Sequence, residues 1–303
     1  MLEIIKAIVY GIVEGITEWL PISSTGHLIL VERLIPFKQT SEGFFDMFDV
    51  VIQLGAILAV VVLFWNKIWP FYLKKNKQPK KGGIVKAKKD PAVGNVALSM
   101  DAFWMWVKIV VACIPAVVYG LLFDDAVSEA FKKEIGTSGV TIQVIVVAVM
   151  LVLVGVLFIV IENWNKNRVP TTTTLSQLTY RDALIIGFCQ LVAAALPGTS
   201  RSGATILGAI MIGISRTVAA EFTFFLAIPV MFGASLLKLL KFGFAFTGME
   251  LACLLVGTVV SFIVSLFVLR FLMGYIKKHD FKVFGWYRIV LGIIVLLYFL
   301  VFA

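Results

Sequence analysis

Hydrophobic residues gather in six long stretches along the chain, separated by short polar segments. Each stretch holds about 20 mostly apolar residues, the length that a helix needs to cross the hydrocarbon core of a bilayer. Pro115 and Pro229 lie inside two of them, where neighbouring helices of a membrane bundle tolerate a kink. The pattern therefore predicts six transmembrane helices, at about residues 45–65, 103–123, 140–161, 218–240, 249–273 and 287–303.

Two further apolar stretches, residues 3–35 and 183–214, are each interrupted by a run of Pro, Gly, Ser and Thr. About 14–16 apolar-rich residues precede each interruption, which is too few to span a bilayer. Irregular backbone survives at membrane depth only where it faces protein or a water-filled cavity. We therefore predict two re-entrant helical hairpins, each returning to the side from which it entered.

The two interrupted stretches resemble each other. Residues 11–24 match residues 187–200 at a constant offset, with Gly, Leu-Pro and Ser coinciding and Glu14 opposite Gln190. Three predicted spans follow each hairpin, and this odd number of crossings per half inverts the second half relative to the first. The predicted fold is an all-α polytopic membrane protein with an inverted-topology repeat, whose halves are residues 1–165 and 177–303.

The composition agrees with this membrane class. Of the 303 residues, 60% are hydrophobic and 15% are charged, and the mean hydropathy is +0.98. A soluble domain of this length needs more polar surface than such a composition supplies. The net charge of +9 does not point to nucleic acid, because nine lysines are concentrated between Lys67 and Lys89. A Lys-rich loop between apolar runs is typical of a cytoplasmic loop, here residues 66–102.

The remaining loops follow the same asymmetry of charge. With the Lys-rich loop inside, the segments 162–182 and 274–286 must also be cytoplasmic, and both are basic. Both termini and the opposite loops, where acidic residues offset the lysines, are then outside. The first hairpin enters from outside and the second from inside, so we expect their tips to meet near the midplane. The outer loops are residues 36–44, 124–139 and 241–248.

Charged groups within the hairpins indicate a functional site, because charge at membrane depth is costly. Glu14 and Glu18 are four residues apart and share one helix face, where like charges repel unless a cation lies between them. Carboxylate oxygens suit a hard divalent ion such as Mg²⁺ or Ca²⁺. The alternative is that one glutamate is protonated and merely hydrogen-bonded within the bundle.

Hydroxyl-rich runs follow the prolines at both hairpin tips. Hydroxyls and free backbone N–H groups at a helix N-terminus can bind an anion, and Arg201 suits bidentate binding of phosphate. His27 is within reach of Ser24 as a general acid or base. Plain helix capping, a satisfied core histidine and an ion pair of Arg201 with a glutamate are the alternatives. The candidate substrate-binding residues are Ser23, Thr25, Gly26, Thr199, Ser200, Arg201 and Ser202.

Residues 11–27 and 196–205 together resemble the motifs of bacterial undecaprenyl-diphosphate phosphatases of the bacitracin-resistance type. The resemblance covers essentially the whole chain, apart from a Lys-rich insertion at about residues 74–90. It implies a multi-pass protein of the bacterial cytoplasmic membrane that hydrolyses a polyprenyl diphosphate to the monophosphate carrier lipid for peptidoglycan synthesis. It also implies a divalent metal and a site that faces the outside. The matching positions are Glu14, Glu18, Ser24, Thr25, His27 and Arg201.

For the chemistry, we expect Ser24 to attack the terminal phosphorus while His27 or Glu18 takes its proton, with Arg201 offsetting phosphate charge. Direct attack by water is the alternative. A lipid transporter or flippase is the rival function, since broken helices in inverted repeats are typical of transporters. A phosphatidic-acid-phosphatase motif is excluded, because Leu207 stands where that motif needs histidine. The sequence leaves open the metal, the lipid chain length and whether the protein is a homodimer.

Overall fold

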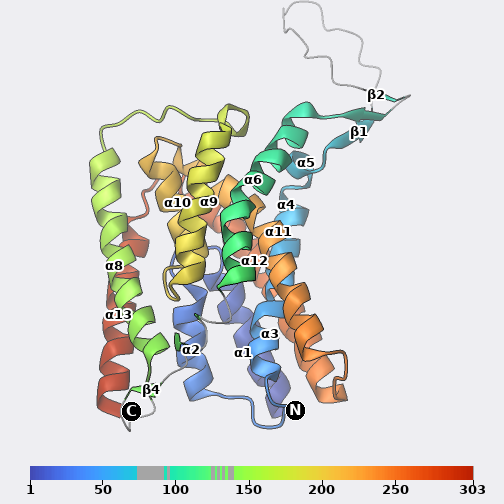
Figure 1. The fold of residues 1–303 in the computed structure, drawn as a ribbon, viewed down its shortest axis with the longest axis vertical. Coiled ribbons are helices and arrows are strands. Elements are labelled where there is room, and N and C mark those ends of the chain that lie inside the picture. The colour runs from blue at the N-terminus through green and yellow to red at the C-terminus, as the bar shows by residue number, and fades with distance from the viewer. Residues whose placement is uncertain are drawn as a thin grey trace, which may run out of the picture.

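Helices form most of the chain, as the apolar pattern predicts (Figure 1). The computed structural model describes residues 1–73, 92–93, 96–123, 127, 130–131, 134–135 and 140–302. Most lysines of the predicted cytoplasmic loop, and most of the predicted outer loop 124–139, lie outside the described residues. The longer helices are α1 (Leu2–Thr17), α2 (Ser24–Leu34), α3 (Phe44–Val51), α4 (Gln53–Leu63), α6 (Met100–Leu122), α8 (Ile142–Asn165), α9 (Tyr180–Ala195), α10 (Arg201–Met211), α11 (Arg216–Phe242), α12 (Gly248–Tyr275) and α13 (Lys282–Phe302).

Short elements occupy the connections between these helices. Three strands pair antiparallel in the order β1-β3-β2 close to the short helix α5, and β4 pairs with β5 at the opposite end of the bundle. The sequence pattern did not predict these small ribbons, which are too short to affect the fold class. Their bounds are α5 (Trp65–Ile68), β1 (Phe71–Leu73), β2 (Ala92–Val93), β3 (Val96–Leu98), β4 (Glu134–Ile135), β5 (Val140–Thr141) and the 3₁₀ turn η1 (Leu175–Gln177).

All six predicted spans are helices long and apolar enough to cross a membrane. The first is built from α3 and α4, which meet at Ile52, while α6 and α11 continue through Pro115 and Pro229. The last span begins at Lys282, five residues before the predicted start. Because of this earlier start, the buried Arg288 lies nearly two turns inside the helix instead of at its first turn. The chain is an all-α polytopic membrane protein.

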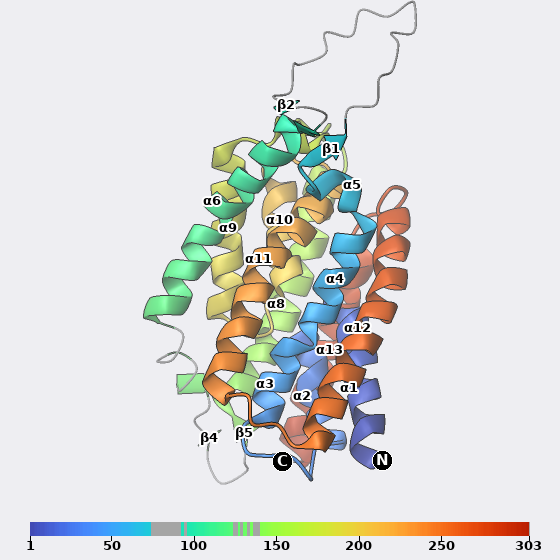
Figure 2. The same ribbon diagram turned by 90° about the vertical axis from the view of Figure 1, so that its right-hand side faces the viewer.

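The two predicted hairpins are also helical, and they lie at opposite ends of the bundle. Helices α1 and α2 lie at the end that holds both termini, and α9 and α10 lie at the end that holds β1 and β2 (Figures 1 and 2). Within each pair, a short irregular segment separates the two helices, at residues 18–23 and 196–200. The breaks therefore occur at the Pro-containing runs that the sequence marks.

Each hairpin packs against a span from the other half of the sequence. Helix α1 packs along α12, and α9 packs along α6. Helices α8 and α13 approach closely because Gly155 and Gly285 face each other; a Cβ on either would lie 2.7 Å from the carbonyl oxygen of the other. Small residues at such contacts let membrane helices come together. An inverted repeat would produce this packing of each hairpin against a span of the other half. The repeat and its boundaries stay a prediction.

Candidate active site

Both hairpin tips have the same unusual backbone at the start of their second helix. Ser23 (φ 75°) and Ser200 (φ 71°) are the two non-glycine residues with positive φ in the described chain. Each hydroxyl accepts the backbone N–H three residues later, from Gly26 and from Gly203, and so caps the helix. The N-cap alternative is therefore correct for Ser23, and Ser200 caps its helix in the same way.

This geometry corrects the sequence alignment of the two tips. The constant offset pairs Ser24 with Ser200, whereas the structure makes Ser23 the equivalent of Ser200. The reason is one extra residue between proline and cap in the second hairpin: Ile22 stands alone in the first, whereas Gly198 and Thr199 both precede the second cap. Ser24 is thereby displaced past the cap, which leaves its hydroxyl free for another partner.

That partner is Glu18, whose carboxylate joins the two hairpins. One carboxylate oxygen accepts the Ser24 hydroxyl at 3.0 Å, and the other accepts Nη2 of Arg201 at 2.9 Å. The Glu18 and Arg201 side chains are only 8% and 14% exposed. A charge-assisted bond in such a setting is stronger than at a surface. The structure thus brings three predicted site residues together, although they come from both ends of the chain.

Further contacts fix Arg201 and its neighbours. Nη1 of Arg201 donates to the carbonyl of Thr223 on α11 at 3.2 Å, and the hydroxyl of Ser202 donates to the backbone carbonyl of Glu18 at 3.1 Å. Ser200 and Ser202 also share a hydrogen bond. The Thr199 hydroxyl is buried with no hydrogen-bond partner among the described residues. The arginine is therefore held in place on two sides, and the ion pair with Glu18 that the sequence offered as an alternative is present.

His27 lies apart from Ser24 in this arrangement. Its Nδ1 donates to the Ser23 carbonyl at 2.7 Å, and its Nε2 shares a hydrogen bond with the Tyr287 hydroxyl, also at 2.7 Å. The two rings are stacked with centroids 5.6 Å apart. Both ring nitrogens are thus engaged elsewhere. Of the two predicted proton acceptors for Ser24, Glu18 is the one in hydrogen-bonding contact.

Glu14 is fully buried one helical turn before Glu18. Neither of its carboxylate oxygens has a hydrogen-bond partner in the described part of the chain, and one oxygen of Asp49 on α3 shares this condition. Buried carboxylates without donors are suited to a cation. No group of three or more acidic, His or Cys side chains among the described residues is arranged for a metal. Mg²⁺, however, is commonly held by one or two carboxylates together with substrate phosphates, so Glu14 and Glu18 fit that role.

Arg288 on α13 was missed by the sequence analysis. It is completely buried, and its guanidinium donates to the carbonyls of Pro21 at 3.2 Å, Gly198 at 2.8 Å and Thr199 at 2.9 Å. One arginine thus ties the two tips together. The signal available in the sequence was an arginine beside an apolar run. Because the last span was predicted to begin at residue 287, Arg288 was expected at the membrane surface.

The chain is similar to known proteins over nearly its whole length. Residues 7–294 match the family described as bacitracin resistance protein BacA. The undecaprenyl-diphosphatase of Desulfitobacterium hafniense is 58% identical over 299 residues, covering 99% of this chain and 97% of that protein. Those of Enterococcus faecalis and Acetivibrio thermocellus are each 56% identical, over 98% and 99% of this chain and 97% and 99% of their own lengths.

Proposed function

The chain belongs to the bacitracin resistance protein family, and on that premise we propose that it hydrolyses undecaprenyl diphosphate within the membrane. The products are undecaprenyl phosphate, which is reused as carrier lipid for the cell wall, and inorganic phosphate. The observation that carries this proposal is the Glu18 carboxylate, which contacts both the Ser24 hydroxyl and the Arg201 guanidinium. These contacts support the proposal, because they bring together the groups proposed as base, nucleophile and phosphate-binding cation.

In the proposed reaction Glu18 takes the proton of the Ser24 hydroxyl, and the serine oxygen attacks the terminal phosphorus. A bond forms between the serine oxygen and phosphorus, the anhydride P–O bond breaks, and the lipid monophosphate leaves. Water then cleaves the phosphoserine to release phosphate. Arg201, held by Glu18 and Thr223, offsets the charge on the phosphate oxygens. His27 lies at the same tip, and its ring nitrogens are hydrogen-bonded to the Ser23 carbonyl and the Tyr287 hydroxyl.

We further propose that Glu14 and Glu18 hold a divalent ion, Mg²⁺ or Ca²⁺. The support is the pair of Glu14 oxygens that are buried without a donor. When bound, such an ion supplies positive charge that the diphosphate needs. The residues proposed to contact the headgroup are those at the two tips: Ser23, Thr25, Gly26, Thr199, Ser200, Arg201 and Ser202.

Hydrolysis is tested with purified protein in detergent and a lipid diphosphate as substrate. We expect metal-dependent release of inorganic phosphate, and a phosphoserine at Ser24 in a single turnover. Release of phosphate without a trapped phosphoserine would indicate that water, and not Ser24, attacks the phosphorus. Binding of the lipid without any release of phosphate would favour a transporter instead.

The site is proposed to open toward the outside of the cell, because the Lys-rich loop is expected inside. The test is to label cysteines placed at the two ends of the bundle. Single cysteines at Ser41 and Gly243, in an otherwise cysteine-free chain, should react with a membrane-impermeant thiol reagent in intact cells. Cysteines at Lys80 and Lys278 should react only after permeabilisation. Labelling of Ser41 and Gly243 from opposite sides would refute this topology, and reversal of all four would place the opening inside.

A further inference from the structure

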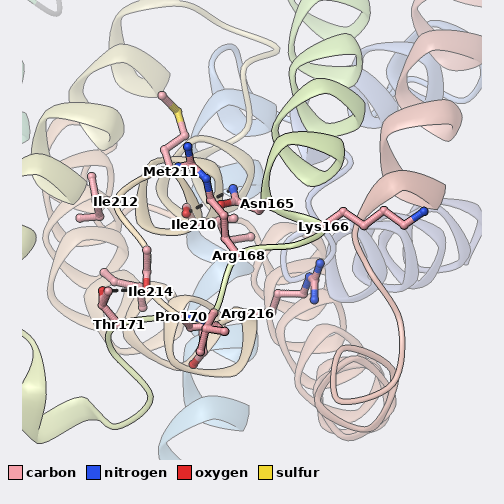
Figure 3. Close-up of a pocket in the computed structure, with 13 residues that line it drawn as sticks. Asn165, Lys166, Arg168, Pro170, Thr171, Ile210, Met211, Ile212, Ile214 and Arg216 are labelled. Atoms are coloured by element: carbon pink, nitrogen blue, oxygen red, sulfur yellow. Dashed lines mark hydrogen bonds between the residues drawn. The ribbon is translucent and has the colours of Figure 1, made fainter.

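A cationic hollow lies at the end of the bundle opposite the termini, and it shares no residue with the site at the hairpin tips. Its volume is about 500 Å³. Figure 3 shows it between the segment that follows α8 and the turn that connects α10 to α11. Helix α10 begins at Arg201 and ends at this hollow, so about 16 Å of helix separates the two places.

The walls of the hollow combine positive charge with apolar surface. The charged side chains are Lys166, Arg168 and Arg216, and most of the remaining lining is apolar. Figure 3 shows Lys166 extending away from the other labelled side chains of the lining. An amphipathic lining of this kind suits a ligand with an anionic head and a hydrocarbon tail. The apolar lining residues are Val169, Pro170, Ile210, Met211, Ile212 and Ile214.

Two of the three cations have no acidic partner in the described structure. Arg216 forms a bidentate pair with the buried Glu162, which neutralises it. Neither Lys166 nor Arg168 forms an ion pair with any described residue. Arg168 is instead stacked on Trp164, with its guanidinium carbon 3.5 Å from the ring centroid, which fixes its direction. Lys166 and Arg168 therefore give the hollow positive charge that is not paired with a carboxylate of the described residues.

The position of the hollow matches the depth of lipid headgroups. Trp164 is 51% exposed near the end of the spanning helix α8, and exposed tryptophans at span ends mark the membrane interface. The wall is also rigid: Thr171 N–H donates to the Gly213 carbonyl, and Ser215 N–H donates to the Thr172 carbonyl, both at 2.9 Å. These bonds hold the two sides of the hollow together before any ligand arrives.

We propose that this hollow binds the anionic phosphate headgroup of a membrane lipid, with Arg168 and Lys166 contacting the phosphate and the apolar rim contacting the chains. The site is independent of the hydrolytic one, so its failure would leave the proposed hydrolase function intact. A free phosphate ion offers the same headgroup chemistry, and the experiment must separate the two sources.

Native mass spectrometry of the full-length protein in detergent provides the test, with phosphatidylglycerol as the probe and phosphatidylcholine as the zwitterionic comparison. The variant K166Q/R168Q should retain phosphatidylglycerol about tenfold less well or worse, because charged hydrogen bonds are lost. The matched control K277Q/K278Q removes the same charge beyond the hollow and should bind like the wild type. Lipid-diphosphate hydrolysis and melting temperature verify that the variants are folded.

For the wild type, phosphatidylglycerol should be preferred over phosphatidylcholine and should resist an excess of inorganic phosphate. Equal retention by K166Q/R168Q and wild type would overturn the proposal. Displacement by inorganic phosphate would also overturn it, because the hollow would then bind a free anion. Equal retention of phosphatidylglycerol and phosphatidylcholine by the wild type would overturn the proposal even if the double variant does not fold.

Discussion

The two hairpins have the same backbone design and opposite chemistry. In both, a serine with positive φ caps the second helix through its hydroxyl. The first hairpin carries Glu14 and Glu18, whereas the second carries Gln190 at the matching position and Arg201 after its cap. One tip is therefore anionic and the other cationic. The ion pair between Glu18 and Arg201 exists only because the two tips differ.

Two hairpin tips with similar backbones can thus form one asymmetric site. The single extra residue before the second cap shifts its register, so Ser24 follows its cap while Ser200 is a cap. The hydroxyl of Ser24 is available to Glu18, and that of Ser200 is used by the backbone. The shared backbone positions both tips, and the identity of the side chains then separates the proposed catalytic tip from the proposed phosphate-binding one.

The largest effect is expected for Glu18→Gln, which removes the charge that distinguishes the first tip. Loss of the base for Ser24 and of the partner for Arg201 should lower turnover by roughly a thousandfold. The control is Glu32→Gln, which alters an exposed carboxylate of the same hairpin and should leave turnover unchanged. Phosphate release and the yield of folded protein are measured. Normal turnover in Glu18→Gln would remove Glu18 from the reaction.

Ser24→Ala and Ser200→Ala separate the two serines that the sequence offset pairs. Ser24→Ala should abolish the phosphoserine and nearly all turnover with little change in melting temperature, because Ser24 is not a cap. Ser200→Ala should cost about 1 kcal/mol of stability through loss of a cap. Thermal unfolding in detergent and phosphate release distinguish the two results. Identical behaviour of both variants would show that the serines are equivalent.

A smaller effect is expected for Arg288→Lys, which tests the link between the tips. A lysine cannot reach three carbonyls at once in the fork geometry of a guanidinium, so about 1–3 kcal/mol of stability should be lost. Arg270→Lys on the exposed side of α12 is the matched control and should change little. An unchanged melting temperature for Arg288→Lys would mean that the tips hold together without this side chain.

The sequence predicts the helices well because each span is a strong and local apolar signal. The six spans and the two hairpin breaks are present near the predicted positions. Short ribbons such as β1 and β3 were not anticipated, since two or three residues carry too little pattern.

The site could be predicted only in part, for a different reason. Motif chemistry identifies Glu18, Ser24 and Arg201, but the contacts between them depend on how the hairpins meet. His27 illustrates the limit: spacing placed it within reach of Ser24, whereas Tyr287 from the last helix engages it instead. Arg288 was missed because its function depends on backbone carbonyls from both tips, which leave no mark in the sequence.

A double-mutant cycle on Glu18 and Arg201 tests most directly the claim that the two tips form one reaction centre. kcat/KM is measured for the wild type, Glu18→Gln, Arg201→Gln and the double variant. Residues that act as a unit give strongly non-additive losses. We predict that the double variant is about as slow as Glu18→Gln alone. Losses that simply add would contradict the account, since the hairpins would then contribute independently.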